Sequence, residues 1–102
     1  KIYFAPFGAD GVLVVDPTTN VSDTAAIAGF VGGDKWNDVV FLHTTGNLYF
    51  SPRTSTRVLI VDPTTNQSNV NIIAGLAEQV HKWRDVAVAP TTGKLYFCPL
   101  SA

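Results

Sequence analysis

The chain of 102 residues has a single cysteine, no methionine, almost no net charge and no long apolar run. Its seven basic and eight acidic residues leave a formal net charge of −1 and form no basic cluster. This composition argues against binding to nucleic acid or to an anionic membrane surface. No apolar stretch approaches the roughly 18 residues of a membrane-spanning helix, and no signal peptide is evident. We therefore predict neither nucleic acid nor membrane as a partner. The absence of methionine is expected of a processed chain or of a fragment.

Motifs of catalysis and of cofactor binding are also missing. No serine or cysteine lies in a nucleophile-elbow motif, and no glycine-rich stretch has the spacing of a phosphate loop. The two histidines, His43 and His81, occupy non-equivalent positions of the internal repeat described next, whereas a repeated metal site would repeat its ligands. We therefore predict no enzyme, no metal site and no cofactor.

What the sequence does contain is an internal repeat. The stretch DPTTN occurs at 16–20 and again at 62–66, each time after an apolar run, VLVV or VLIV. Around it the stretches IAG, KW-x-D and TTG recur, and KIYFAP is matched by NLYFSP and then by KLYFCP. The chain therefore divides into a first repeat over 1–46, a second repeat over 47–93, and the start of a third repeat over 94–102.

Short apolar runs rich in β-branched and aromatic residues predict strands within each repeat. The runs end at Gly, Pro or Thr-Thr signals, and no window holds a helical apolar stripe. Four strands are expected per repeat, roughly WNDVVFL, LYF, GVLVVD and TAAIAGF. Because VLVV and VLIV are apolar on both sides, their strands are expected to be buried on both faces. An all-β fold is predicted, in which a small antiparallel sheet repeats every 46 or 47 residues as the blades of a β-propeller do.

The stretches TRVLIVDPTTN, IAGL and RDVAVAPTTGKLYF resemble the YVTN type of β-propeller repeat. The resemblance covers nearly the whole chain and implies a fold, although TTG replaces the usual Pro-Asp-Gly and KW replaces the usual Pro-x-Gly. It implies two four-stranded antiparallel blades per chain. Because propellers close with about four to eight blades, the ring is completed by missing sequence or by other copies bound head to tail. One of the duplicated strands, 1–7 or 94–100, is then surplus at each joint, and the sequence does not indicate which.

The DPTTN turn is predicted to be architectural. Asp16 and Asp62 are expected to accept hydrogen bonds from N–H groups two residues further on, and Asn20 and Asn66 to adopt the left-handed conformation that closes the turn. Both asparagines also begin N-x-[ST] sequons, which are compatible with glycosylation of an extracellular protein. Turn chemistry explains the same residues, so both interpretations stay open. The sequons are the reason why localisation leans towards extracellular.

The motif KW-x-D is the main candidate for a ligand site. Its members are Lys35, Trp36 and Asp38 in the first repeat and Lys82, Trp83 and Asp85 in the second. One interpretation is packing, in which the Trp lies between neighbouring blades and the Asp accepts hydrogen bonds from nearby N–H groups. The other is sugar binding, in which an aromatic face contacts apolar sugar carbons and the carboxylate accepts hydroxyl protons.

The differences between the repeats gather at one predicted end of the sheets. The loop FGADG is replaced by RTSTR and FVGGD by LAEQVH, whereas DPTTN and TTG at the other end do not change. We therefore expect any ligand at the end that carries 7–11, 30–35, 53–57 and 76–82. Cys98 aligns with Ala5 and Ser51 and is expected to be a small buried side chain, with a reactive or intermolecular thiol as the alternative.

Together these features predict a non-enzymatic binding module. The favoured function is lectin-like carbohydrate binding by an oligomeric propeller, since repeated sites on a ring would give avidity. The alternative is a structural or protein-interaction scaffold, including a glycosylated extracellular assembly. The expected partners are copies of the chain itself, bound head to tail, and glycans.

Overall fold

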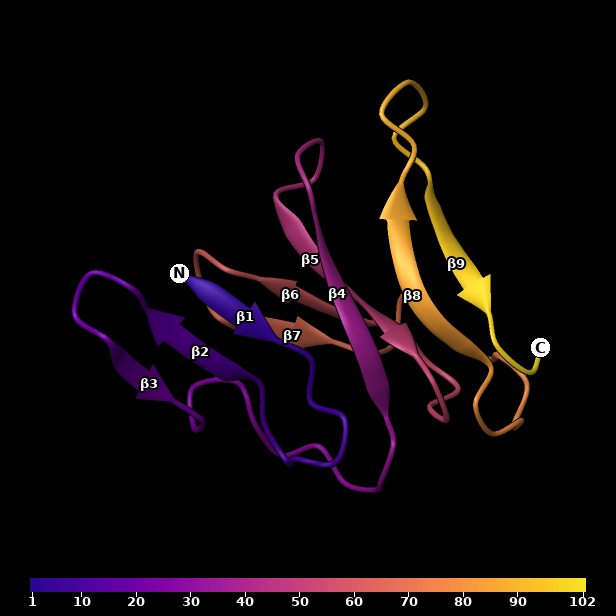
Figure 1. Ribbon diagram of the computed structural model, residues 1–102, viewed down its shortest axis with the longest axis horizontal. Coiled ribbons are helices and arrows are strands. Elements are labelled where there is room, and N and C mark those ends of the chain that lie inside the picture. Colours follow the sequence, from indigo (N-terminus) through magenta and orange to yellow (C-terminus); the bar gives the residue numbers. More distant parts are fainter.

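The computed structural model describes residues 1–102 and contains nine strands and no helix (Figure 1). With no helix present, none is long and apolar enough to cross a membrane. The strands are β1 (Ile2–Phe4), β2 (Leu13–Asp16), β3 (Val21–Asp23), β4 (Trp36–Leu42), β5 (Asn47–Pro52), β6 (Leu59–Asp62), β7 (Gln67–Asn69), β8 (Trp83–Val88) and β9 (Leu95–Pro99). They form three antiparallel sheets, ordered β1-β2-β3, β4-β5-β6-β7 and β8-β9. The predicted all-β class is confirmed.

Only the middle sheet has four strands, and the other two sheets repeat parts of its arrangement. In β1-β2-β3, Phe4 lies opposite Leu13, as Phe50 of β5 lies opposite Leu59 of β6. In β8-β9 the pairing and its irregularity after the tryptophan repeat those of β4-β5. The first sheet therefore lacks an inner strand, and the last sheet lacks its two outer strands. No ring is closed within the chain.

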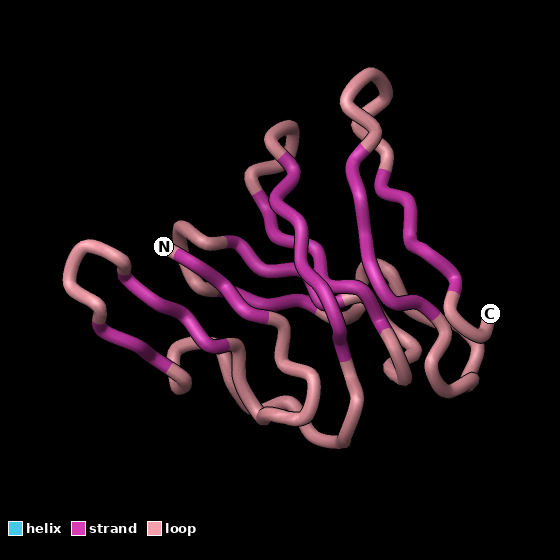
Figure 2. The backbone as a smooth tube through the Cα atoms, viewed as in Figure 1, coloured by secondary structure: helices cyan, strands magenta, loops and turns pink.

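The middle sheet is buried on both faces, as the two-sided apolar runs predict. Leu48 and Phe50 of β5 point into one core, which the first sheet shares, whereas Tyr49 points into a second core. On β6, Leu59 and Ile60 divide between the two cores in the same way. Figure 2 shows the three sheets side by side, with the middle one covered by both neighbours. Burial of these side chains is the main stabilising contribution to the stack.

The two DPTTN turns have the predicted hydrogen bonds. Oδ1 of Asp16 accepts from the Thr18 N–H at 2.9 Å, and Oδ1 of Asp62 accepts from the Thr64 N–H at the same distance. Asn20 and Asn66 have φ angles of 58° and 59°, which is the predicted left-handed conformation. The turn joins the third and fourth strands of the middle sheet, so its predicted hydrogen bonds, conformation and place between the strands are confirmed.

The prediction of TAAIAGF as the fourth strand is wrong. The fourth strand is formed by the residues that directly follow the turn, VSD in β3 and QSN in β7. Oδ1 of Asp23 accepts hydrogen bonds from the next two alanine N–H groups, at 2.7 and 3.0 Å, which turns the chain away from the sheet. The alanine-rich segment then crosses the end of the sheet, where Ile27 accepts a hydrogen bond from the Val12 N–H at 2.8 Å. A Cβ on Gly11 would lie 2.6 Å from the Thr24 carbonyl oxygen, so this close crossing needs glycine.

The expectation that Cys98 is buried is also wrong for this chain. Its thiol is exposed, whereas the equivalent Ser51 in the middle sheet is fully buried. The difference arises because β9 has a neighbour on one side only. Cys98 is thus exposed because the last sheet has no third strand beside β9, whereas the equivalent Ser51 is buried in the middle sheet, where that strand is present.

Candidate functional site

The loops that differ between the repeats lie together at one end of the stack, opposite the TTG turns that project at the top of Figure 1. A series of backbone hydrogen bonds joins them. The Lys35 N–H donates to the Phe7 carbonyl at 2.9 Å, and the Arg53 N–H donates to the Lys35 carbonyl at 2.8 Å. The Lys82 N–H continues the series to the Arg53 carbonyl at 2.8 Å. Each sheet is therefore tied to the next at this end, which positions the loops relative to one another.

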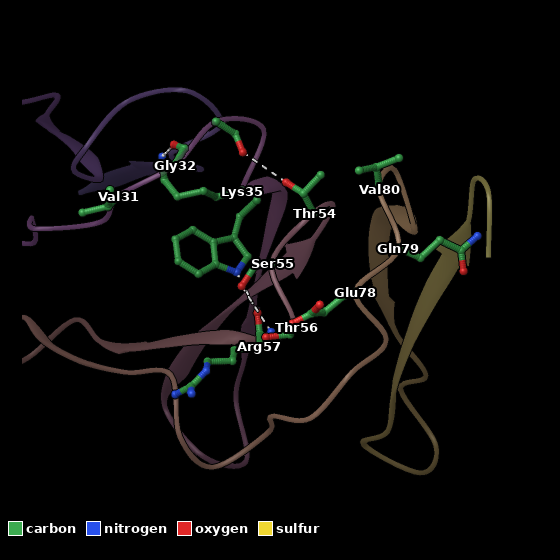
Figure 3. A pocket seen from close by; sticks show the side chains of 12 residues that line it. Val31, Gly32, Lys35, Thr54, Ser55, Thr56, Arg57, Glu78, Gln79 and Val80 are labelled. Atoms are coloured by element: carbon green, nitrogen blue, oxygen red, sulfur yellow. Dashed lines mark hydrogen bonds between the residues drawn. The ribbon is translucent and has the colours of Figure 1, made fainter.

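Three of these loops surround a cleft of about 500 Å³ (Figure 3). Residues 31–33 form one side, 54–57 another, and 78–80 the third. The segments come from the end expected for a ligand in both repeats. These segments contribute hydroxyls, an amide, one cation and one anion, and Lys35 and Trp36 of the first KW-x-D motif also line the cleft.

Some of the polar groups around the cleft are held by internal hydrogen bonds. Thr54 Oγ1 donates to the Asp34 carbonyl at 2.5 Å, Arg57 Nη1 donates to Asn71 Oδ1 at 2.6 Å, and the amide of Gln79 donates to the Ser101 carbonyl. Glu78 is exposed, and its carboxylate makes no hydrogen bond within the chain. Glu78 is therefore the one charged group of the cleft that stays free to accept hydrogen bonds from a ligand.

The lysines of the KW-x-D motif are buried and support the loops. Nζ of Lys35 donates to the Gly32 carbonyl at 2.5 Å, and Nζ of Lys82 donates to the Gln79 carbonyl at 2.9 Å. Their exposed fractions are 4% and 1%. Desolvation by burial lowers the pKa of Lys82. Each ammonium group holds the carbonyl three residues earlier and so closes the loop that precedes the inner strand.

The two tryptophans of the motif have different surroundings. Trp36 is 4% exposed, lies edge-on to Phe30 with ring centroids 5.2 Å apart, and donates from Nε1 to the Arg57 carbonyl at 2.9 Å. Its ring leaves no open face for a sugar. Trp83 is half-buried, and its Nε1 makes no hydrogen bond within the chain. A small apolar cavity beside it is lined by Val58, Leu76 and Phe97 among others.

The two aspartates of the motif differ in the same way. Oδ2 of Asp38 accepts a hydrogen bond from the Val86 N–H at 3.2 Å and so joins the second sheet to the third. Asp85 is exposed and has no such partner. The first copy of the motif therefore makes contacts between sheets, and the second copy has the same residues without the neighbouring sheet. No group of three or more His, Cys, Asp or Glu side chains is placed to hold a metal ion.

The two sequon asparagines, Asn20 and Asn66, are exposed at the tips of their turns. Neither of them lines the cleft. The groups that sequence reasoning did not single out are Glu78, Arg57 and the hydroxyls of 54–56. The divergence of 53–57 and 76–82 pointed to their loops, but nothing in the residue types separated them from ordinary polar loop residues.

No protein-family model, no curated protein and no solved structure matches this chain.

Proposed function

We propose that the chain is a non-enzymatic binding module of the β-propeller class, whose cleft between the diverging loops binds a carbohydrate. The observation that carries this proposal is the cleft itself, whose lining includes hydroxyl, amide and carboxylate groups. Sugar hydroxyls are both donors and acceptors, so a lining of this kind matches them without a metal ion. Lys35, Lys82 and Trp36 of the KW-x-D motif hold carbonyl groups of the loops around the cleft, and we do not propose that the sugar stacks on the buried Trp36 ring.

Glu78 is the residue on which the test of carbohydrate binding depends. A fluorescently labelled protein is applied to a glycan array, and the glycans retained are compared for the wild type and for Glu78→Gln. The matched control is Asp10→Asn, which removes a carboxylate of an exposed loop at the same end but outside the cleft. We expect retention by the wild type and by the control, and loss of retention by Glu78→Gln. An array on which the wild type retains no glycan refutes carbohydrate binding.

A structural or protein-interaction scaffold is the second candidate, and the two incomplete sheets favour it. Their free edges and half-exposed apolar residues are the parts of the chain best suited to contact another protein surface. On this proposal the propeller ring is completed by other copies of the chain, and the exposed sequons at Asn20 and Asn66 suit an extracellular, glycosylated assembly. A wild type that forms a defined oligomer and binds no glycan supports the scaffold alone.

A further inference from the structure

The first sheet has no strand equivalent to β4, and the last sheet has no strands equivalent to β6 and β7, so each holds what the other is missing. The middle sheet shows what belongs on the free edge of β9, because its equivalent strand β5 pairs with the β6-β7 hairpin. The chain carries one other hairpin of this kind, β2-β3, which pairs with β1 in the register that β6 has with β5. β1 and β9 occupy the same position of the repeat, so either can be the second strand of a blade that includes β8.

We propose that a second copy of this chain docks head to tail, pairs its β2-β3 hairpin with the free edge of β9, and releases its own β1 to do so. In the register of the first sheet, Tyr96 then lies opposite Val14 and Phe97 opposite Leu13 of the second copy. The inference rests on the propeller arrangement proposed above and is independent of carbohydrate binding, because its tests use no ligand.

The exposed surface of the last sheet fits this occupant. Tyr96 is 58% exposed, whereas the equivalent Tyr49 in the middle sheet is 8% exposed and covered by the next sheet. A second copy brings its own β4 sheet against Tyr96, as the last sheet lies against Tyr49. Burial of such aromatic area is the main favourable term expected at the joint.

The second KW-x-D motif supplies the polar contacts of the joint. Trp36 donates to the carbonyl of Arg57, and the equivalent acceptor for Trp83 is the carbonyl of Gly11 of the second copy. Asp38 accepts from the N–H of Val86, and the equivalent donor for Asp85 is the N–H of Val39 of the second copy. Both side chains lack partners within the chain, and docking satisfies them with the geometry that the first motif shows.

Several contacts hold β9 more firmly than β1. β9 has five residues and β1 has three, and the tail after β9 adds hydrogen bonds from Leu100 N–H to the Lys82 carbonyl at 2.7 Å and from Ser101 N–H to the His81 carbonyl at 2.9 Å. Residues 89–94 join β8 to β9 and residues 5–12 join β1 to β2, so the slightly longer connection gains slightly more entropy when it opens.

Residues 5, 51 and 98 occupy the same position of the repeat, and the side chain at this position also favours β9 over β1 as the strand that remains. In the middle sheet Ser51 is fully buried there, and its hydroxyl has no hydrogen-bond partner. A thiol suits such a site better than a hydroxyl, because a cysteine behaves as a small apolar side chain. Cys98 of β9 is also larger than Ala5 of β1 and close in size to Ser51.

The first experiment measures docking in the wild-type protein without ligand. Sedimentation velocity over a range of concentrations gives the mass, and acrylamide quenching of fluorescence gives the exposure of tryptophan. We expect masses that are whole multiples of 10.9 kDa, and Trp83 protected in the oligomer, since Trp36 is already buried in the single chain. A species that stays at 10.9 kDa at every concentration overturns the proposal.

The second experiment identifies the strand that remains, by the rate at which a thiol reagent modifies the oligomer. The wild type reports on Cys98, and the matched variant Ala5→Cys with Cys98→Ser reports on the equivalent position of β1. We expect the wild-type thiol to lose its reactivity on assembly and the thiol at position 5 to stay reactive. The reverse pattern, or a reactive Cys98 in the oligomer, shows that β1 completes the blade and overturns the proposed exchange.

The third experiment compares the two aspartates. Asp85→Ala is expected to weaken association roughly tenfold or more per joint, the scale of one hydrogen bond to a charged group, and to leave the unfolding of the single chain unchanged. Asp38→Ala is expected to lower the stability of the single chain, because its bond lies within the chain. If Asp85→Ala associates as tightly as the wild type, the joint does not repeat the contact between the second and third sheets.

Discussion

Replacement of Trp36 by alanine tests whether the first KW-x-D motif belongs to the core. The change removes a ring that is 4% exposed, its edge contact with Phe30 and its hydrogen bond to the Arg57 carbonyl. Truncation of a buried tryptophan to alanine costs about 3–5 kcal/mol. Small domains have a total stability of roughly 5–15 kcal/mol. We therefore expect Trp36→Ala to lose a large part of its stability, or to be unfolded in dilute solution.

Two further variants separate the contribution of the buried Trp36 ring from that of its hydrogen bond. Trp36→Phe keeps an aromatic ring in the core and loses the hydrogen bond, so it is expected to cost about 0.5–1.5 kcal/mol for that bond, together with the effect of the smaller ring. Trp83→Ala is the matched control, since Trp83 is half-buried and makes no hydrogen bond in the single chain. It is expected to lose less stability than Trp36→Ala. The measurement is guanidinium denaturation followed by circular dichroism at low protein concentration. Equal denaturation midpoints for the wild type and Trp36→Ala would refute the core assignment.

Three other changes test the loops and the turns. Burial lowers the pKa of Lys82 from its usual 10.5, so just below pH 10.5 the unfolded chain binds more protons than the folded chain. The free energy of unfolding is therefore expected to rise with pH in that range. In a pH series of urea denaturations, Lys82→Met should abolish this rise. The hydroxyl and N–H of Thr64 lower the pKa of Asp62 from 3.8, so the contribution of Asp62 to the free energy of unfolding is present above pH 3.8 and lost as the pH falls through the lowered pKa. Asp62→Asn keeps an acceptor oxygen and should reduce this loss of stability in acid. An acid unfolding transition that does not change in Asp62→Asn would contradict the assignment. Gly11→Ala places a Cβ 2.6 Å from the Thr24 carbonyl oxygen and should cost about 1–3 kcal/mol in thermal or chemical unfolding, whereas Gly33→Ala, which meets nothing within 4 Å, should be neutral.

The fold was predictable where local chemistry and the repeat agree. The two-sided apolar run VLIV is covered on both faces as predicted, whereas in VLVV only Val12 and Val14 are buried, because the first sheet has a neighbour on one face only. DPTTN predicted its own hydrogen bonds through Asp16 and Asp62. TAAIAGF was not predictable in the same way, because its apolar residues are buried by crossing the end of the sheet and not by pairing along it. The signal for this was present in Asp23, whose carboxylate accepts hydrogen bonds from the following N–H groups and ends the strand.

The candidate site was predictable as a location and not as a set of residues. Divergence between the repeats pointed to the loops that surround the cleft, but the KW-x-D motif was ambiguous between packing and sugar binding. Its lysines are directed to loop carbonyls and Trp36 to the core, which only the three-dimensional arrangement could reveal. The repeated lysines make the same loop contact in both units, whereas Glu78 aligns with Gly32, so its carboxylate is not repeated.

The two copies of KW-x-D are identical in residue type and differ in how many of their contacts lie within the chain. The first copy lies between the middle sheet and its neighbours and has its contacts satisfied, so Trp36 and Asp38 act in folding. The second copy lies at the edge of the last sheet, where the same side chains lack partners. In the proposed assembly, the motif that packs one sheet on the next within the chain would meet a sheet of a second copy. For this chain, the residues that stabilise the fold and those proposed to join its copies are therefore the same residues, one repeat apart.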